Sequence, residues 1–371
     1  MKLVAIDVQA YHTSKMTSGR FATQNDFADL SGTVTSTISL LHQFVASLKA
    51  NTIDAAERPH EPPNFLNLIT DSAKLLKAQV TKMSLLVLNK PFTPIAITKM
   101  VRDISTGCLP ALMTAADLVR EKEEGKILSH TTRSSISRLF IQTIDLLREV
   151  PLRESDLDTV RSSDRGTLAS TGVIWGTCDS LIAIGDTGLA GIVVQQAQEY
   201  RDLLQDAITE LREWKEEGKG TDLDRSNSGE DSASEEDPFS LPAAIPEDDP
   251  ILRAQLEEVV KKLRHIDLIY PPIIKRRLKR LSLVPSLTER SENTQLDVLD
   301  EVMGYLKLIP AEVDELAGFC YQQNHEEITS QLAKVCDLAA KTMERLSLNW
   351  QAESDEFTKW SKRWLEMMDQ P

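Results

Sequence analysis

The sequence contains few aromatic residues, few glycines and only four cysteines. Aromatic residues make up 5% of the 371 residues, and there are 15 glycines. β-Sandwiches and β-barrels depend on aromatic and β-branched side chains and on many tight turns, so this composition argues against both. The cysteines form no Cys-x-x-Cys pair, which argues against a zinc site or a disulfide framework. We interpret them as reduced core residues of an intracellular protein.

The sequence also lacks the residue patterns of familiar catalytic and cofactor sites. His325 is followed by two glutamates, but no second histidine completes a His-Glu-x-x-His zinc motif. The glycine-containing residues 185–191 have neither a preceding strand nor a terminal Gly-Lys-Ser/Thr, so we interpret them as a helix break or a close approach of helices. We expect no catalytic residue, no metal site and no cofactor, and predict that the protein is not an enzyme. The enzymatic alternative is a carboxylate-rich metal site on helices.

Long apolar runs are absent, and the chain is acidic overall. No run of 18 or more apolar residues occurs, so we expect no membrane span. The net charge is −15, and residues 220–249 hold ten acidic residues and one basic residue, a difference of nine that accounts for most of it. Neutralising phosphates requires a basic surface, so direct nucleic-acid binding is not expected.

What the sequence does contain is a repeated helical pattern of apolar residues. Residues 34, 38, 41, 45 and 48 are all apolar and are spaced by four and three, which is typical of one face of an amphipathic helix. Similar stripes recur along most of the chain, and residues 3–8 are the only strand candidate. The pattern predicts an all-α fold made of helices long enough to pack as antiparallel bundles.

Prolines and polar segments set the expected limits of these helices. We expect Pro110 to kink a helix that extends to about residue 122. Residues 152–166 are polar, and we expect them to form a loop. Residues 273–283 are expected to form one helix with a basic face, and Pro310 is expected to open a new helical segment.

Residues 218–246 separate two helical regions. They are rich in Asp, Glu, Ser, Gly and Pro, and they carry too little apolar surface to offset an ordering cost of roughly 1–2 kcal/mol per residue. The predicted organisation is a flexible N-terminal arm (1–25), an N-terminal helical bundle (26–217), an acidic disordered linker (218–246) and a C-terminal helical bundle (247–371).

Three serines of the predicted linker are each followed by acidic residues, as acid-directed kinases require. They are Ser228, Ser232 and Ser234. Each phosphate would add roughly −1.5 to −2 charges to an already negative segment. We predict these serines as phosphorylation sites; a passive acidic tether is the alternative.

A basic cluster follows Pro271 and Pro272 in the C-terminal half. It consists of Lys275, Arg276, Arg277, Lys279 and Arg280. The cluster indicates either a site for nuclear import or an anionic partner, or the solvated face of an amphipathic helix. The second interpretation is favoured, because a signal within a folded helix is poorly accessible.

Three tryptophans lie near the C-terminus, at residues 350, 360 and 364. The last two are four residues apart and share a helix face. They either pack inward or form a partner surface, and core packing is the favoured interpretation.

Several stretches resemble the cyclin-D-interacting protein family, also called GCIP or cyclin-D-binding-protein-like proteins. They are the Leu-Asn-Lys-Pro-Phe-Thr-Pro corner at residues 88–94, the Val-Ile-Trp helix start at 173–175, the acidic linker, and Gln-Leu-Asp-Val-Leu-Asp-Glu-Val at 295–302 with a further helix after Pro310. The resemblance covers most of residues 62–371.

This resemblance implies two helical bundles similar to those of vinculin and α-catenin. It implies a cytoplasmic and nuclear regulator of cell-cycle progression that binds D-type cyclins and other cell-cycle or transcription regulators. It brings no catalytic residues with it. The alternative function is a vinculin- or syntaxin-like adaptor in the cytoskeleton or in membrane trafficking, which the long apolar stripes would also fit.

Overall fold

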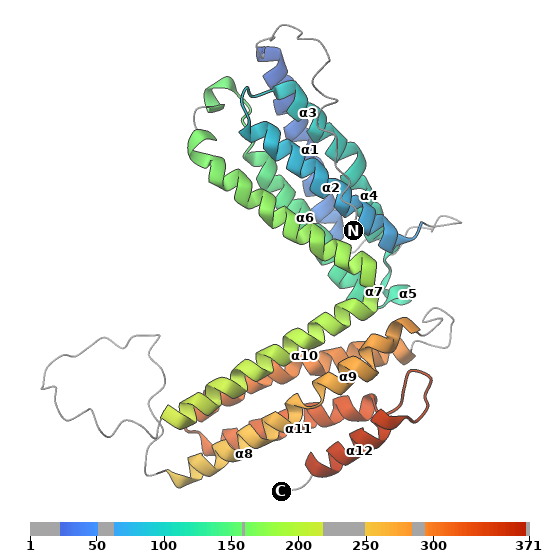
Figure 1. Ribbon diagram of the computed structural model, residues 1–371, viewed down its shortest axis with the longest axis vertical. Helices are drawn as coiled ribbons and strands as arrows, with labels where there is room; N and C mark the ends of the chain where they lie inside the picture. Colours follow the sequence, from blue (N-terminus) through green and yellow to red (C-terminus); the bar gives the residue numbers. More distant parts are fainter. Residues whose placement is uncertain (1–22, 51–62, 158–159, 218–248, 284–293, 369–371) are drawn as a thin grey trace, which may run out of the picture. The chain divides into compact units, whose positions relative to one another are not determined.

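The protein is described by a computed structural model that covers residues 23–50, 63–157, 160–217, 249–283 and 294–368 (Figure 1). Every regular element in these ranges is a helix, and none is a strand, which confirms the all-α prediction. The strand candidate at residues 3–8, the predicted acidic linker and its three serines, Ser228, Ser232 and Ser234, lie outside the described residues. So does the predicted N-terminal arm, except for its last three residues.

The helices divide into two compact units. The first comprises residues 1–50, 74–110 and 137–178, and the second comprises residues 51–73, 111–136 and 179–371. Three helices contribute to both units: α2 (Phe65–Leu88), α6 (Lys126–Arg148) and α7 (Val160–Glu217).

This division differs from the predicted boundary after residue 217, which assigned all of α7 to the N-terminal bundle. The C-terminal part of α7 belongs to the second unit instead. Val193, Leu204 and Leu211 are fully buried there, in a core shared with the helices that follow. The near-3.5-residue spacing of these apolar residues creates a continuous seam, and the later helices cover it.

The first unit is built around α1 (Gln24–Ala50), which lies against α3 (Pro94–Asp103). The start of α1 is capped reciprocally, because the Asp26 amide donates to Thr23 Oγ1 and the Thr23 amide donates to Asp26 Oδ2. Thr93 occupies the N-cap position of α3 without a side-chain capping hydrogen bond, and Pro94 lies in the first turn. Ring pairs join distant segments: Phe27 stacks on Phe92 with centroids 5.9 Å apart.

The helix that begins at Pro94 changes its pitch just before Pro110. α3 is followed by a π-helical turn, η3 (Ile104–Cys108), and then by α4 (Leu109–Leu118) and the short α5 (Glu121–Glu124), which ends at Gly125. Pro110 has no N–H to donate to the preceding turn, and its ring crowds the carbonyl four residues earlier. A wider π turn accommodates both effects, so the predicted kink takes this form.

α7 begins earlier than the sequence pattern predicts. The expected loop at residues 152–166 contains a 3₁₀ turn, η4 (Glu154–Leu157), and the first residues of α7, which starts at Val160. These residues are mainly Ser, Arg, Asp and Thr and carry no apolar stripe. Hydrophobic periodicity therefore cannot reveal this part of the helix.

The glycine-containing residues 185–191 form a kink in α7. Gly188 has φ 59° and ψ −153°, a conformation that residues with a Cβ avoid. A Cβ at Gly185 would lie only 2.0 Å from Thr70 Oγ1 and 2.7 Å from the Leu66 carbonyl oxygen, so α2 and α7 approach closely there. The interpretation of this stretch as a helix break and a close helix approach is confirmed.

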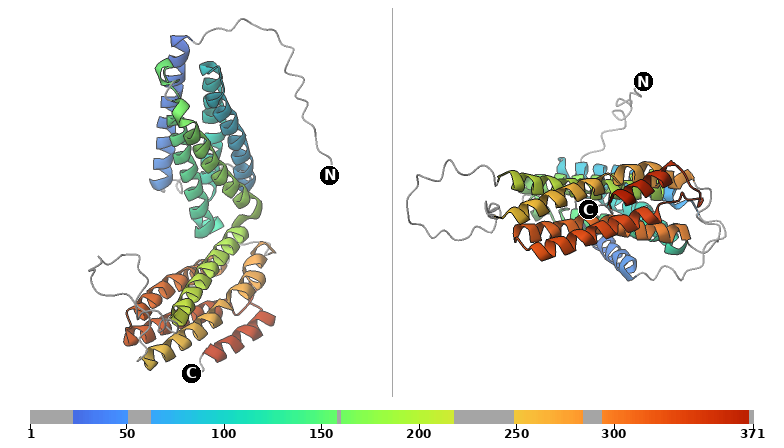
Figure 2. Two further views of the ribbon diagram at one scale, coloured as in Figure 1. Left: turned by 60° about the vertical axis from the view of Figure 1, so that its left-hand side comes forward. Right: turned by 90° about the horizontal axis from the view of Figure 1, so that it is seen from below.

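The C-terminal helices of the second unit pack around α11 (His325–Arg345). It lies against α10 (Thr294–Tyr321), α8 (Pro250–Asp267) and α12 (Glu356–Met368), and Figure 2 shows these helices side by side. α8 carries one apolar stripe with spacings of four and three, and all of it is buried: Leu252, Leu256, Val259, Leu263 and Ile266. The predicted basic helix is divided into α9 (Tyr270–Arg276) and a 3₁₀ segment, η5 (Leu278–Leu283).

Pro310 lies inside α10 and does not open a new segment, so this expectation is wrong. Ile309 and Val313 on either side of it are fully buried. Their burial holds the helix together across the hydrogen bond that proline cannot make.

One described helix, within residues 166–216 of α7, is long and apolar enough to cross a membrane by length and composition alone. A core helix of a soluble protein meets the same criteria. Part of this stretch, from Val193 to Trp214, lies in the core of the second unit. The helix is therefore weak evidence for a membrane span.

Candidate interaction surfaces

The titratable groups of the described residues are scattered. Within the ranges that the structure covers, no group of three or more His, Cys, Asp or Glu side chains could hold a metal ion. Burial raises the pKa of Cys108 to about 11 and that of Cys320 to about 12. Because the thiolate is the nucleophilic form, these thiols have the properties of core residues and not of activated nucleophiles.

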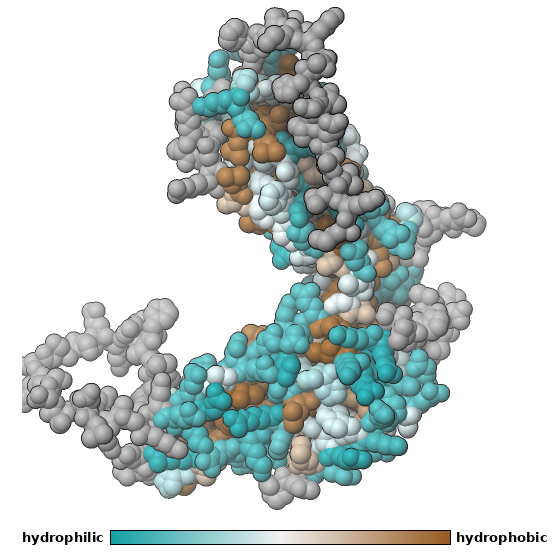
Figure 3. All heavy atoms as spheres, viewed as in Figure 1, coloured by the Kyte–Doolittle hydropathy of each residue, from teal (hydrophilic) through white to brown (hydrophobic). Residues whose placement is uncertain are grey.

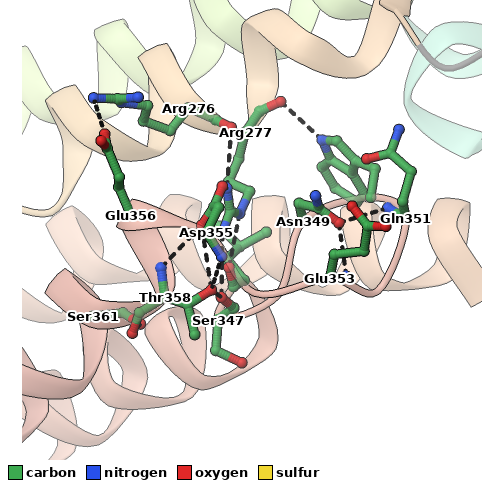
Figure 4. A network of polar contacts seen from close by, with 12 residues as sticks. Arg276, Arg277, Ser347, Asn349, Gln351, Glu353, Asp355, Glu356, Thr358 and Ser361 are labelled. Atoms are coloured by element: carbon green, nitrogen blue, oxygen red, sulfur yellow. Dashed lines mark hydrogen bonds and ion pairs between the residues drawn. The ribbon is translucent and has the colours of Figure 1, made fainter.

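Arg277, the central residue of the predicted basic cluster, lies in the interior of the second unit and is 0% exposed (Figure 4). Its guanidinium donates two hydrogen bonds to the Asp355 carboxylate, at 2.8 and 3.0 Å. It also donates to the carbonyl oxygens of Leu346 and Ser347, at 2.8 and 3.2 Å. Its central carbon lies 4.2 Å from the ring centroid of Phe357. Arg277 thus links the end of α9 by hydrogen bonds to the connection between α11 and α12.

The partners of Arg277 are themselves held in place. The Arg277 guanidinium beside Asp355, together with the Thr358 amide, holds the pKa of that carboxyl well below its usual range. Asp355 Oδ1, which accepts from Arg277, also accepts from the Thr358 amide at 3.0 Å, at the start of α12. Trp350 donates its ring N–H to the Arg277 carbonyl at 2.9 Å. These contacts give Arg277 a structural role.

The five residues of the basic cluster therefore do not form one surface patch. Arg276 pairs with Glu356 at 3.1 Å, and Lys275, Lys279 and Arg280 are exposed. Arg277 is four residues from both Ile273 and Leu281, which are buried, so it falls on the apolar stripe of the segment. That spacing is the sequence signal that separates Arg277 from its basic neighbours.

The C-terminal tryptophans pack mainly inward, as the favoured interpretation predicts. Trp350 and Trp364 are buried, and the Trp364 ring N–H donates to the His265 carbonyl at 2.9 Å. Trp360 is half-buried and lies beside Phe357, with ring centroids 5.6 Å apart.

An apolar surface that the sequence interpretation missed lies in the first unit. Hydrophobic side chains reach the surface over α2 and the first half of α7 (Figure 3). Leu85 is 53% exposed, Leu168 is 58% exposed and Trp175 is 38% exposed. We define the α2–α7 face as Leu85 of α2 with Leu168, Gly172, Trp175 and Gly176 of α7.

Two hydrogen bonds fix the geometry of the α2–α7 face, one between two hydroxyl groups and one donated by an indole. Ser84 and Thr171 join their hydroxyls at 2.7 Å in the buried seam between the helices. Trp175 donates its ring N–H to Thr81 Oγ1 at 3.0 Å, so the indole lies with its polar edge against α2. The order of these pairs along both helices shows that α2 and α7 run antiparallel here.

Two glycines leave the α2–α7 face without side chains next to Leu168 and Trp175. A Cβ placed on Gly172 or Gly176 would meet no atom of another segment within 4 Å. Leu168, Gly172, Trp175 and Gly176 are spaced by four, three and one, so they share one side of the helix. The result is an exposed leucine and indole beside bare backbone, a surface that another helix can approach closely.

The described residues define an all-α protein with an exposed apolar face and no clustered metal ligands among them. Residues 68–217 match the family described as Grap2 and cyclin-D-interacting, N-terminal. The match confirms the resemblance that the sequence indicates. It includes every residue of the α2–α7 face.

Two fungal proteins are similar to most of the chain. An uncharacterized protein of Schizosaccharomyces pombe is 23% identical over 301 residues, which is 81% of this chain and 83% of the relative. An uncharacterized protein of Saccharomyces cerevisiae is 22% identical over 336 residues, which is 82% of this chain and 90% of the relative. No solved structure matches the chain significantly.

Proposed function

We propose that the protein is a non-catalytic regulator that binds other proteins, with a D-type cyclin as its partner and cell-cycle progression as the process it modulates. The observation that carries the proposal is the α2–α7 face, which lies within the family segment and exposes Trp175. The description of the family names cyclin D as an interaction partner of its members. Tryptophan anchors surrounded by smaller apolar contacts are typical of the residues that dominate binding energy at interfaces.

The chemistry of the α2–α7 face favours a helical partner. An apolar helix can place its side chains against Leu168 and Trp175 while its backbone approaches Gly172 and Gly176. Because the Trp175 N–H is already bonded to Thr81, the indole is held in place before a partner arrives. A side chain that is ordered in advance loses less entropy on binding.

The proposal also includes the wider organisation. We propose two antiparallel bundles of the vinculin and α-catenin kind, an acidic linker between them, and a cytoplasmic and nuclear protein without enzymatic activity. An adaptor of the cytoskeleton or of membrane trafficking is not favoured, because the family is described by its interaction with cyclin D.

The test is the affinity of the full-length protein for a purified D-type cyclin, measured by calorimetry. Replacing Gly176 by Gln adds bulk where a Cβ meets no atom, and it raises helix propensity, so the fold is retained while close approach is blocked. Replacing Trp175 by Ala removes the anchor. A hot-spot loss of at least ~2 kcal/mol corresponds to binding weakened about 30-fold.

Leu268→Ala and Leu308→Ala are the matched controls, because both leucines are exposed to a similar degree in the second unit. They should leave the affinity unchanged. If the wild-type chain does not bind the cyclin, the proposed partner is wrong. If it binds but Gly176→Gln and Trp175→Ala bind equally well, the proposed face is wrong.

A further inference from the structure

A groove with a basic lining lies in the second unit between the C-terminal part of α7 and α8. The two helices run antiparallel there, since Lys215 pairs with Glu257 and Arg201 pairs with Asp267, each at 2.8 Å. The groove has a volume of about 480 Å³. Its charged lining residues are Arg212, Lys215, Glu216, Glu257, Lys261 and Arg264.

The positive charges of this groove exceed its negative charges. Glu257 neutralises Lys215 through their ion pair. Arg212, Lys261 and Arg264 are exposed, and none of the three forms an ion pair with a residue that the structure describes. Glu216 is the one remaining acid among the lining residues that the structure describes, so three cations without an ion pair among these residues face one carboxylate. The groove therefore fits an anionic ligand.

The chain itself supplies acidic residues beside this groove. α7 ends at Glu217 and α8 begins at Pro250. Residues 218–248, between them, contain nine acidic and two basic residues. Most connections between packed helices have only about 2–8 residues, so this connection is unusually long.

Both ends of this acidic segment are attached at the same end of the groove. Arg212 lies little more than one turn before the end of α7, and Arg264 lies 14 residues into α8, about 21 Å along the helix. An extended chain spans roughly 3.3 Å per residue, so the chain between Glu217 and Pro250 is long enough for its acidic residues to reach the whole groove. Attachment at both ends raises their effective concentration to the order of millimolar.

We propose that the groove between α7 and α8 binds the chain's own acidic segment, residues 218–248, through Arg212, Lys261 and Arg264. The proposal concerns the second unit and is independent of cyclin binding. Phosphates on Ser232 and Ser234 would add negative charge and strengthen the contact, because arginine pairs with phosphate bidentately.

The experiment is carbodiimide cross-linking of the full-length protein, which joins amines to nearby carboxylates, with the products mapped by mass spectrometry. Lys261 is the reporter amine of the groove, and the exposed Lys275 and Lys279 are comparison amines of the same unit. We expect Lys261 to join carboxylates of residues 222–237 several-fold more often than either comparison lysine. At about 1 M salt, where the screening length falls to ~3 Å, the excess should disappear.

Charge reversal separates binding in the groove from mere proximity. Arg212→Glu with Arg264→Glu keeps Lys261 as reporter and should lower its cross-links to the level of Lys275. The matched control, Lys279→Glu with Arg280→Glu, makes the same change in net charge elsewhere and should leave them unchanged. Mixing labelled and unlabelled protein identifies the source of the carboxylates.

Equal cross-linking of all exposed lysines, or no response to Arg212→Glu with Arg264→Glu, would overturn the proposal. Cross-links found only between labelled and unlabelled chains would assign the occupant to a second copy and overturn it as well. Because no cyclin is present in this experiment, its failure says nothing about the proposed function.

Discussion

Arg277 allows the sharpest quantitative prediction. Arg277→Met keeps much of the side-chain volume but removes the guanidinium donors, so Asp355 and the carbonyls of Leu346 and Ser347 each lose the hydrogen bonds that Arg277 gives them. Removing one partner of a buried ion pair costs about 3–5 kcal/mol. The Asp355 side chain is 25% exposed and regains some water, which places the expected loss near the lower end, at about 3 kcal/mol.

The assay is equilibrium unfolding in urea at neutral pH, followed by tryptophan fluorescence. Trp350 is a direct reporter, because its ring N–H donates to the Arg277 carbonyl. The control is Lys341→Met, whose ion pair with Asp337 in the same unit is about half exposed on both sides. Exposed pairs contribute about 0–1 kcal/mol, so this variant should be nearly neutral. An Arg277→Met loss no larger than that of the control would refute the reasoning.

Three further predictions follow from single residues. The folded-state pKa of Asp355 is lowered, so the stability that its carboxylate contributes is fully present above the unfolded pKa of about 3.9. This contribution is lost as the pH falls through the folded-state pKa. The difference in stability between wild type and Asp355→Asn, measured by urea unfolding, should therefore shrink below about pH 4. Gly188→Ala should lower the free energy of unfolding by about 1–3 kcal/mol, because Gly188 has a positive φ. The control is Gly304→Ala on α10, where a Cβ meets no neighbouring segment, and it should be neutral or stabilising. Equal effects of the two substitutions would contradict backbone strain at position 188. Burial raises the pKa of Cys108 to about 11, so only about one thiol in a thousand is ionised at pH 8. An alkylating reagent should therefore label Cys108 only after unfolding. Rapid labelling of the native protein would be inconsistent with its burial.

The helices were predictable wherever an apolar stripe faces a single core. The stripe of α8 and the break at Gly188 follow from residue spacing and from the conformational freedom of glycine. The start of α7 was not predictable in this way, because residues 160–166 have no apolar stripe. The sequence also did not predict that the C-terminal part of α7 belongs to the second unit, because an apolar stripe does not identify the helices that pack on it.

The surfaces were less predictable than the helices, because sequence composition does not report exposure. Arg277 has the charge of its neighbours but the spacing of the buried stripe, and only its partners Asp355 and Leu346, distant in sequence, explain how a guanidinium is accommodated there. Trp175 was identified only as part of a helix start. Its exposure depends on the pairing of α2 with α7 and on two neighbouring glycines that leave it uncovered.

The most direct test of the central claim is hydrogen–deuterium exchange of the full-length protein with and without a purified D-type cyclin. Binding at the α2–α7 face predicts slower exchange in α2 around Leu85 and in α7 between Leu168 and Gly176, and this protection should be lost in Gly176→Gln. Unchanged exchange in these two stretches, with protection elsewhere or with none, would contradict the account.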